Sequence, residues 1–239
     1  MKKPAILIPA YNEGKYIKDV ILQCRRYNND IIIVDDGSTD NTNEILKSVK
    51  DLSGLEVIII EHEVNQGKGE ALKTGCNYAV RNEYSGVITI DADGQHNVGE
   101  IADFLNAIET NKPDVIVGSR LKNTKGMPFI RLATNLFTSW LISVIAGKKI
   151  NDVQSGFRYL GYDVLKNIKL ETKNFDTESE MLLKASWMDY KIVNIPISTI
   201  YHKDFVSHVN PLKDTLKFFK LIFRSFGWKR RFKRSRTSS

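Results

Sequence analysis

The chain has 239 residues, of which 42% are hydrophobic and 26% charged, so it can bury one substantial core and is too apolar to remain disordered. Its two cysteines, Cys24 and Cys76, have no paired-ligand spacing, which gives no support to a disulfide framework or a zinc site and fits a reducing, cytoplasmic setting. The formal net charge of +7 belongs to one end, because six cations and no acid follow Gly227 and residues 1–227 carry only +1.

The first half of the chain alternates short β-rich apolar runs with segments of helical periodicity. The residues from Met1 to Pro9 include an apolar stretch too short for a secretion signal, so they are expected to form a first strand. The expected strands are Ala5–Pro9, Ile31–Val34, Leu55–Ile60, Gly86–Ile90 and Asp114–Val117. The expected helices are Lys15–Tyr27, Asn41–Val49, Gly69–Arg81 and Gly99–Asn111. This alternation predicts an α/β fold, with a mostly parallel sheet between two helical layers.

The pattern changes after Arg120. Residues Phe129–Gly147 repeat apolar side chains at helical spacing and carry no charge between Arg131 and Lys148. Polar residues interrupt this helix, which is too short and too polar to span a bilayer, so it is expected to be amphipathic and to face either a membrane or the core. The remaining expected elements are a helix at Glu178–Met188, a strand at Ile192–Ile200 and a helix at Pro211–Phe226. We interpret Glu178 and Glu180 mainly as acids favoured by the positive end of their helix.

Polar clusters follow four of the predicted strands. They are Tyr11-Asn12-Glu13, the run from Asp35 to Asp40, the run from Asp91 to His96, and Gly118-Ser119-Arg120. The carboxyl ends of parallel strands share one edge of an open sheet, and ligands bind there, so these clusters should converge. Any one of them, the run from Asp35 to Asp40 above all, could instead serve only as a turn or a helix cap.

Asp91 and Asp93 are harder to explain as caps. Two carboxylates at positions i and i+2 repel each other unless a cation or a proton lies between them. Mg²⁺ and Mn²⁺ bind such oxygen ligands together with the phosphates of a substrate. The pair therefore predicts a divalent cation that holds a diphosphate and stabilises its departure as a leaving group.

Several motifs resemble those of the family 2 glycosyltransferases, most closely the branch of dolichol-phosphate mannose synthases and polyprenyl-phosphate glycosyltransferases. They are Pro9-Ala10-Tyr11-Asn12-Glu13, Val34-Asp35-Asp36-Gly37-Ser38-Thr39-Asp40, Asn65-Gln66-Gly67-Lys68-Gly69, Asp91-Ala92-Asp93-Gly94-Gln95-His96 and Gly118-Ser119-Arg120. They occur in the family's order, and the similarity extends from residue 5 to about residue 210.

The resemblance implies a GT-A fold, which is a Rossmann-like three-layer sandwich, and it assigns roles to individual residues. The nucleotide base and ribose pocket would be lined by Pro9, Tyr11, Glu13 and Asp36. The metal ion, Mg²⁺ or Mn²⁺, would be surrounded by Asp91, Asp93 and Gln95. Lys68 would contact the donor, and the two arginines Arg120 and Arg131 would clamp phosphate through their planar guanidinium groups. For Arg131, a plain surface position at the start of a helix is an equal alternative. For Glu178 and Glu180, the resemblance gives an alternative to the role of helix-end charges, because the family often has acids near the acceptor at this place.

The segment from Asn151 to Arg158 resembles the family's Asp-x-x-x-Gly-Phe-Arg segment, in which the aspartate lies near the acceptor. Two roles are open for Asp152. If the acceptor is a sugar hydroxyl, Asp152 would act as the general base. If the acceptor is a phosphate, it is already ionised, and Asp152 would orient or support the site.

Residues 1–210 are expected to form the catalytic domain, and residues 211–239 an amphipathic basic helix with a tail. In that helix Leu212, Leu216, Phe219, Ile222, Phe223 and Phe226 share one face, and Lys213, Lys217, Lys220 and Arg224 form a stripe on another. Together with Trp228 and the cations that follow, this helix is expected to rest on anionic lipid. The alternatives are packing against the domain with a solvated tail, and nucleic-acid binding, which is the least expected.

We therefore predict an inverting, metal-dependent hexosyltransferase that moves a sugar from a UDP- or GDP-linked donor to a polyprenyl phosphate such as dolichyl or undecaprenyl phosphate. It would act as a peripheral protein on the cytoplasmic face of a membrane. A family 2 enzyme that glycosylates a saccharide hydroxyl, and a noncatalytic module that binds nucleotide sugars, are the alternatives. Asp91, Asp93, Gln95 and Arg120 together disfavour the noncatalytic module.

Overall fold

A seven-stranded sheet forms the centre of the computed structural model, which describes residues 1–28, 30–50, 57–122, 127, 129–174, 176–200 and 221–231. The strands are β1 (Ala5–Ala10), β2 (Ile31–Asp35), β3 (Val57–Glu61), β4 (Gly86–Thr89), β5 (Val115–Ser119), β6 (Arg158–Gly161) and β7 (Ile192–Pro196). Their spatial order is β3-β2-β1-β4-β6-β5-β7. All neighbours pair in parallel except that β6 is antiparallel to β4 and β5.

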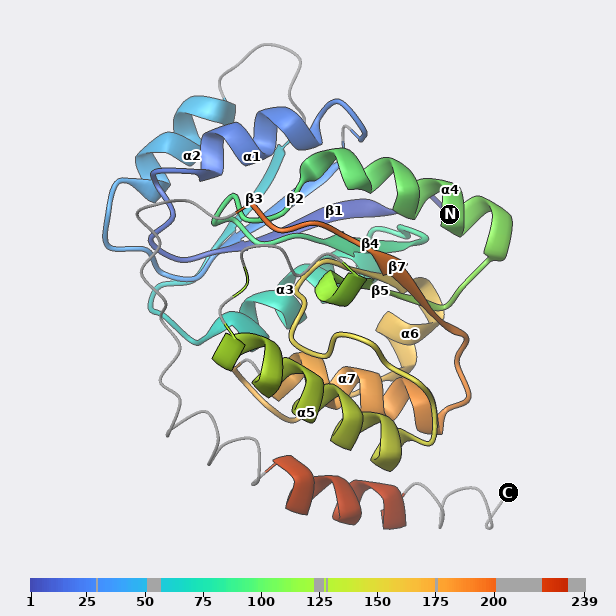
Figure 1. Ribbon diagram of the computed structural model, residues 1–239. Helices are drawn as coiled ribbons and strands as arrows, with labels where there is room; N and C mark the ends of the chain where they lie inside the picture. The colour runs from blue at the N-terminus through green and yellow to red at the C-terminus, as the bar shows by residue number, and fades with distance from the viewer. Residues whose placement is uncertain are drawn as a thin grey trace.

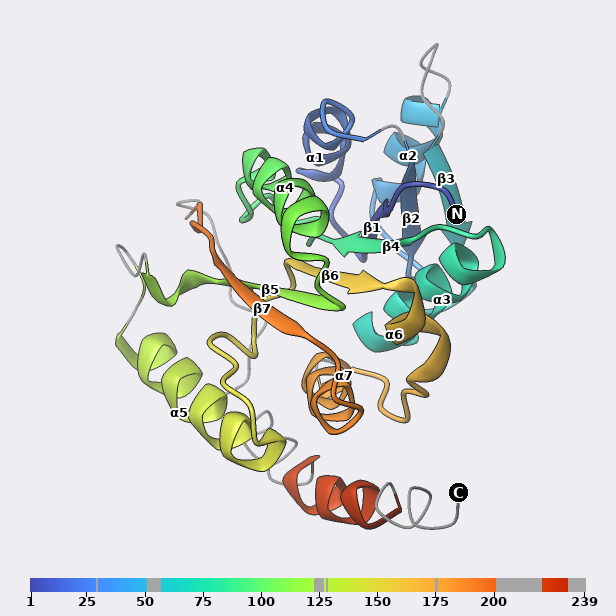
Figure 2. The same ribbon diagram turned by 90° about the vertical axis from the view of Figure 1, so that its right-hand side faces the viewer.

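Helices cover both faces of the sheet (Figures 1 and 2). One layer contains α1 (Ile17–Cys24), α2 (Thr42–Lys50) and α4 (Ile101–Asn111), and the other contains α3 (Lys68–Arg81), α6 (Tyr162–Asn167), α7 (Asp176–Trp187) and α5 (Phe129–Ala146). Two short 3₁₀ turns, η1 (Val98–Glu100) and η2 (Arg120–Lys122), follow β4 and β5. The predicted α/β sandwich with a mostly parallel sheet is confirmed.

The strands are continuous apolar runs because each face of the sheet meets a helical layer. In β1, Ala5 and Leu7 point into the core beneath α3, whereas Ile6 and Ile8 point into the core beneath α1 and α4. All four side chains are fully buried. Since side chains alternate along a strand, a strand buried on both sides needs apolar residues at every position.

Two elements of the sheet region were not predicted. The strand β6 begins at the arginine of the Gly-Phe-Arg segment, and the helix α6 follows it directly. The strand has only four residues and begins with Arg158, a charged residue that breaks the apolar run by which buried strands are found. Arg158 is nevertheless 2% exposed, because its guanidinium donates hydrogen bonds to three backbone carbonyls.

The terminal helix is described over residues 221–231, and residues 201–220 lie outside the described part of the chain. The prediction of a helix at Pro211–Phe226, and the predicted faces formed by its earlier residues, fall mostly on that part. Within 221–231 the helix packs on the domain through Leu221, Ser225 and Trp228, which are all buried. We expected Trp228 at the lipid surface, but its ring lies over Lys184 of α7, with Nζ 4.7 Å from the ring centroid. The side chains left exposed include Phe223 and Phe226.

Candidate active site

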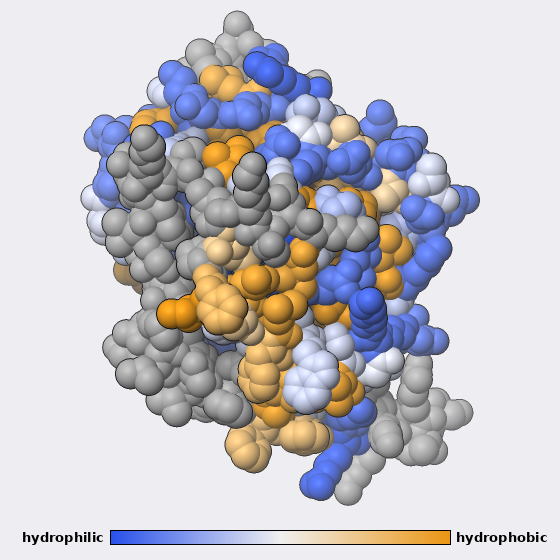
Figure 3. Space-filling view, viewed as in Figure 1, coloured by the Kyte–Doolittle hydropathy of each residue, from blue (hydrophilic) through white to orange (hydrophobic). Residues whose placement is uncertain are grey.

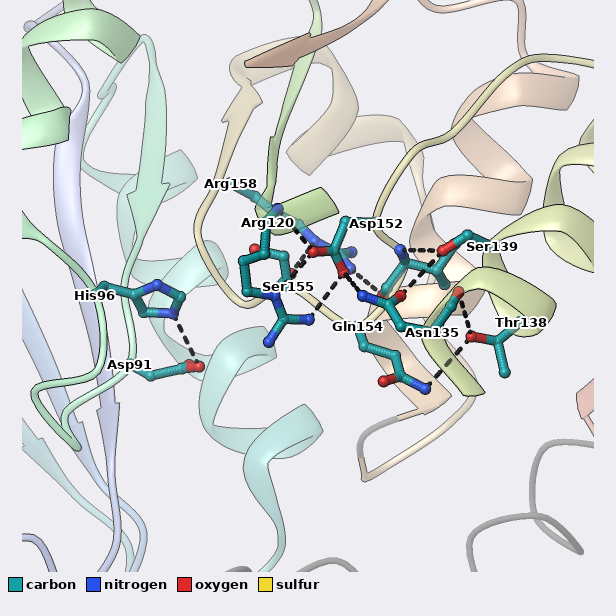
Figure 4. A network of polar contacts seen from close by, with 11 residues as sticks. Asp91, His96, Arg120, Asn135, Thr138, Ser139, Asp152, Gln154, Ser155 and Arg158 are labelled. Carbon is teal, nitrogen blue, oxygen red and sulfur yellow. Dashed lines mark hydrogen bonds and ion pairs between the residues drawn. The ribbon is translucent and has the colours of Figure 1, made fainter. Parts of the chain in front are cut away.

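The polar clusters converge at one edge of the sheet, as predicted. The carboxyl ends of β1, β2, β4 and β5 place there the residues around Glu13, Asp36, Asp91 and Arg120. Because β6 is antiparallel, it begins at this same edge, so the loop before it brings Asp152 and its neighbours to the site (Figure 4).

Asp91 is the centre of a group of charges. One of its carboxylate oxygens, Oδ1, lies 2.7 Å from Nζ of Lys68, which is also 3.2 Å from Oε1 of Glu178. The other, Oδ2, lies 3.3 Å from Nε2 of His96. Burial opposes the charge on Lys68, but Asp91 and Glu178 outweigh it and raise the pKa of this lysine. Burial likewise opposes the charge on Asp91, while Lys68 and His96 hold the pKa of this carboxyl well below its usual range.

Asp93 and Glu13, at the same edge, are not neutralised in this way. Burial, together with the charge of Asp91, raises the pKa of Asp93. Burial, then Asp93, Asp91 and Asp40, raise the pKa of Glu13 to about 7. Lys68 therefore leaves negative potential around Asp93 and Glu13, which an added cation would relieve.

Carboxylate oxygens are suitable donors for Mg²⁺ or Mn²⁺, so Asp91 and Asp93 fit the predicted ion. Among the described residues, no three His, Cys, Asp or Glu side chains form a complete metal-binding group. The two aspartates would thus need oxygens from a ligand to complete the coordination. Gln95 is 6% exposed, its backbone N–H donates to Oδ1 of Asp93 at 3.0 Å, and its side-chain Nε2 has no hydrogen-bond partner among the described residues.

Asp36 binds the loop that leads into α3. Its Oδ1 lies 2.7 Å from Nδ1 of His62 and accepts the backbone N–H of Gln66 at 3.0 Å, and its Oδ2 accepts that of Gly67 at 2.7 Å. Gly67 has a φ of +98° and lies against the backbone of residue 173, so a side chain at this position would be strained and would clash. Asp36 and Gly67 together present Lys68 to Asp91.

Arg120 and Asp152 form a buried bidentate pair. Nε and Nη2 of Arg120 each lie 2.8 Å from one oxygen of Asp152, and the backbone N–H of Arg120 donates to Oδ2 at 3.0 Å. The amide of Asn135, on α5, donates to Oδ1 at 2.9 Å (Figure 4). Burial opposes the charge of Asp152, but these hydrogen bonds and the charge of Arg120 lower the pKa of the carboxyl. Asp152 has 0% exposure.

The remaining predicted residues occupy separate places around this edge. Pro9 is buried within β1 beside Val34 of β2, and Tyr11, just beyond the strand, is 43% exposed. Arg131 is partly buried in the first turn of α5, one helical turn before Asn135.

The comparison with known families decides which family the chain belongs to. The model of the family described as "Glycosyl transferase family 2" matches residues 5–172. The chain belongs to glycosyl transferase family 2. This membership confirms the family predicted from the motifs.

Relatives of this glycosyltransferase include proteins named for transfer to polyprenyl phosphates. The UDP-N-acetylglucosamine–dolichyl-phosphate N-acetylglucosaminyltransferase of Methanococcus voltae is 38% identical over 213 residues, which cover 82% of this chain and 85% of that protein. The polyprenol monophosphomannose synthase of Mycolicibacterium smegmatis is 25% identical over 207 residues, covering 82% of this chain and 77% of that protein.

Solved structures share the fold of this glycosyltransferase. Glucosyl-3-phosphoglycerate synthase from Mycobacterium tuberculosis, in complex with Mn²⁺, uridine diphosphate and phosphoglyceric acid, aligns with a TM-score of 0.70 at 15% identity, covering 95% of this chain and 78% of that one. Mannosyl-3-phosphoglycerate synthase from Rubrobacter xylanophilus aligns with a TM-score of 0.68 at 15% identity, covering 98% and 75%. The GT-A fold of this family 2 member is confirmed.

Three residues of the glycosyltransferase's site had not been assigned this role from the sequence. Glu178, interpreted as a helix-end charge, pairs with Lys68. Gly156 lies so close to Asp91 that a Cβ there would overlap the carboxylate. Arg158 donates to the carbonyls of residues 153, 155 and 178, so it joins the Asp152 loop to α7. Gly156 and Arg158 belong to a motif noted in the sequence, but what they contact depends on β6, which was not predicted.

Proposed function

We propose that this family 2 enzyme is an inverting glycosyltransferase that moves a hexose from a UDP- or GDP-linked donor to the phosphate of a polyprenyl phosphate. It would work as a peripheral protein on the cytoplasmic face of a membrane. The names of the Methanococcus and Mycolicibacterium relatives support this acceptor class, and the former makes UDP-N-acetylglucosamine the first donor to test.

The contacts of Asp152 favour a phosphate over a sugar hydroxyl as the acceptor. A sugar hydroxyl must lose its proton during attack, and Asp152 was the residue predicted to remove it. Both oxygens of Asp152 instead accept hydrogen bonds from Arg120 and Asn135, and its pKa is lowered, so it is poorly suited to take up a proton. A phosphate acceptor is ionised near neutral pH and needs no base. Asp152 then serves as a positioning residue, which fixes the guanidinium of Arg120.

The donor would bind over the carboxyl ends of β1, β2 and β4. Pro9, Tyr11 and Glu13 would line the nucleoside pocket, and Asp36 would fix the loop that forms its wall. Mg²⁺ or Mn²⁺ would be held by Asp91, Asp93 and Gln95 with the donor's diphosphate, and when bound it would supply Lewis-acid stabilisation of the leaving group.

Two arginines are the candidates for binding the reacting phosphates. Arg120, fixed by Asp152, and Arg131, on the first turn of α5, would clamp the acceptor phosphate and orient it toward the donor. An oxygen of the acceptor phosphate attacks the anomeric carbon as the bond from that carbon to the diphosphate oxygen breaks. The nucleoside diphosphate leaves with the bonding electrons, and the single displacement inverts the anomeric configuration.

The test uses matched acceptors. Purified enzyme, Mn²⁺ or Mg²⁺ and labelled UDP-N-acetylglucosamine, UDP-glucose or GDP-mannose are incubated with polyprenyl phosphate, with the same polyprenol lacking its phosphate, or with a free oligosaccharide. We expect label in the lipid phase only with polyprenyl phosphate. Transfer to the oligosaccharide or to the unphosphorylated polyprenol would refute the proposal, as would the absence of transfer from every donor.

A further inference from the structure

The outer face of α5 is an exposed apolar strip. Its side chains recur at spacings of three and four residues, so they lie on one side of the helix. Ile130 is 76% exposed, Trp140 61% and Val144 60%. The strip is completed by Phe129, Ala133, Leu136 and Phe137. Figure 3 shows hydrophobic side chains gathered over α5 on this face of the molecule.

The inner face of the same helix is bound to the domain, both by Ile142, Ile145 and Ala146 in the hydrophobic core and by hydrogen bonds of its polar side chains. The hydroxyl of Ser143 accepts the backbone N–H of Ile150 at 3.0 Å, and that of Ser139 accepts the backbone N–H of Val153 at 3.1 Å. Together with Asn135, these side chains form a ladder along the loop that contains Asp152. Hydrogen bonds therefore hold the inner face of α5 to the domain, whereas the outer face presents mainly apolar side chains.

This arrangement fits a helix that lies on a bilayer rather than across it. Among the described residues, α5 is the one helix whose length and composition would let it cross a membrane, a criterion that the core helix of a soluble protein also meets. Its 18 residues extend about 27 Å, just short of a hydrocarbon core. The polar ladder would have to break before the helix could enter the lipid on all sides.

The strip is flanked by positive charge. No acid occurs between Phe129 and Ala146. Lys149 follows the helix and is exposed, and the helix at 221–231 adds the exposed residues Arg224 and Arg230. That helix is held beside the C-terminal end of α5, where Nζ of Lys229 donates to the carbonyl of Ile145 at 3.1 Å. An apolar strip with cations beside it is complementary to anionic lipid headgroups over acyl chains.

We propose that α5 is the surface by which the enzyme docks on a lipid bilayer, with its outer face among the acyl chains, and that docking places Arg120 at the depth of lipid phosphates. The path from the strip to the site is short, because Asn135 of α5 binds Asp152, which binds Arg120. This inference rests on the proposed transfer to a lipid phosphate. It assigns the principal membrane contact to α5, whereas the sequence predicted that the terminal helix makes this contact.

A second copy of the chain would cover the strip less well than a bilayer does, because its charges do not complement those beside the strip. In a symmetric dimer formed through α5, the cations beside one strip would lie near those of the other, with no acid on either helix to pair with them. A bilayer that contains anionic lipid supplies the opposite charge. The test therefore includes the oligomeric state in buffer without lipid or detergent.

Flotation with vesicles tests the docking surface. The double variant Phe137→Ser/Trp140→Ser is compared with the wild type and with Tyr27→Ser, an exposed aromatic residue outside α5. On vesicles of phosphatidylcholine mixed with phosphatidylglycerol, we expect the double variant to bind at least about tenfold more weakly, since two large apolar side chains no longer enter the lipid. Equal flotation of the double variant and the wild type would overturn the proposal, and so would a wild-type dimer that does not bind vesicles.

A fluorescence measurement tests the same surface with a conservative substitution, which is not expected to disturb the fold of α5. Trp140→Phe keeps the strip apolar but removes the one tryptophan on it, while Trp187 and Trp228 pack against the domain. Bromine atoms on the acyl chains should quench the emission of the wild type and leave the emission of Trp140→Phe almost unchanged. Equal quenching of both proteins would show that Trp140 does not enter the bilayer.

Transfer assays distinguish failure of the docking proposal from failure of the proposed function. A short, water-soluble isoprenyl phosphate presents the acceptor group without a membrane. The double variant should lose at least about tenfold of its activity on polyprenyl phosphate in vesicles and should keep its activity on the soluble acceptor. Equal loss on both acceptors would contradict membrane docking. If the wild type transfers to neither acceptor, the proposed function fails, and flotation still decides whether α5 docks.

Discussion

At the scale of single residues, Asp152 shows how environment decides the role of a carboxylate. A general base needs an accessible lone pair and a pKa near the working pH. Asp152 is fully buried, accepts hydrogen bonds from Arg120 and Asn135, and has a lowered pKa. The carboxylate is therefore suited to holding Arg120 in one orientation.

The substitution Asp152→Asn separates the two roles. The amide keeps the shape of the side chain but leaves the buried Arg120 without its counter-charge, which should lower the free energy of unfolding by about 3 kcal/mol. If Asp152 positions Arg120, the loss in kcat/KM should come mainly from a higher KM for the phosphate acceptor. A base would instead lower kcat and leave that KM unchanged. Steady-state kinetics with varied acceptor, beside urea unfolding, measures both effects.

Asp93 should affect activity and stability in opposite directions. Its pKa is raised by burial and by Asp91, so the folded protein bears a cost for its charge. We expect Asp93→Asn to reduce metal-dependent turnover at least about tenfold, through the loss of one oxygen anion for the cation, and to keep or raise the melting temperature. Turnover against Mn²⁺ concentration and thermal melting would be compared with Asp103→Asn, an exposed change on α4. Unchanged Mn²⁺-dependent turnover would remove Asp93 from the metal site.

At the scale of elements, the sequence predicts the strands and helices that their own residues indicate, without contacts to distant segments. The strands β1 and β2 and the helix α3 are long enough, and apolar or periodic enough, for their own residues to indicate them. The four-residue β6 depends on its neighbours, because Arg158 is satisfied only by carbonyls contributed by other segments. The convergence of the acids was predictable from the strand ends. The contacts of Lys68 with Glu178 and of Gly156 with Asp91 were not, since they join segments far apart in the sequence.

The helix at 221–231 should depend on its buried tryptophan. Trp228 is 4% exposed and packs over Lys184, and Arg231 pairs with Glu171 beside it. We expect Trp228→Ala to cost about 3 kcal/mol if the helix stays packed, or to release the helix at a smaller cost. In either case trypsin should cleave after Lys229 to Arg231 faster than in the wild type. Phe226→Ala, at a side chain that is 53% exposed, is the control and should change neither stability nor cleavage appreciably.

At the scale of the whole molecule, the acids at the sheet edge make stability depend on pH in two directions. Asp91 and Asp152, whose pKa values are lowered, stabilise the fold above the ordinary carboxyl range and lose that contribution as the pH falls through their folded pKa values. Glu13 acts in the opposite sense. Its pKa is about 7 in the folded protein against 4.5 for the ordinary group, so between these values the folded state binds a proton that the unfolded chain has released. Its contribution therefore falls as the pH rises from about 4.5 to about 7.

Replacing Glu13 by glutamine should remove this dependence. Because Glu13 is partly exposed and water screens its neighbours, we expect the effect to be on the order of 1 kcal/mol. Urea unfolding at pH 5 and at pH 8, without divalent cations, should show that Glu13→Gln gains stability relative to the wild type at pH 8 and little at pH 5. The exposed change Glu109→Gln on α4 is the control and should follow the wild type at both values. If Glu13→Gln shows the same difference from the wild type at pH 5 and pH 8, Glu13 is not the group that titrates. Mn²⁺ and a nucleoside diphosphate should then shrink the gain at pH 8, because a cation beside Asp91 and Asp93 lowers the cost of an ionised Glu13.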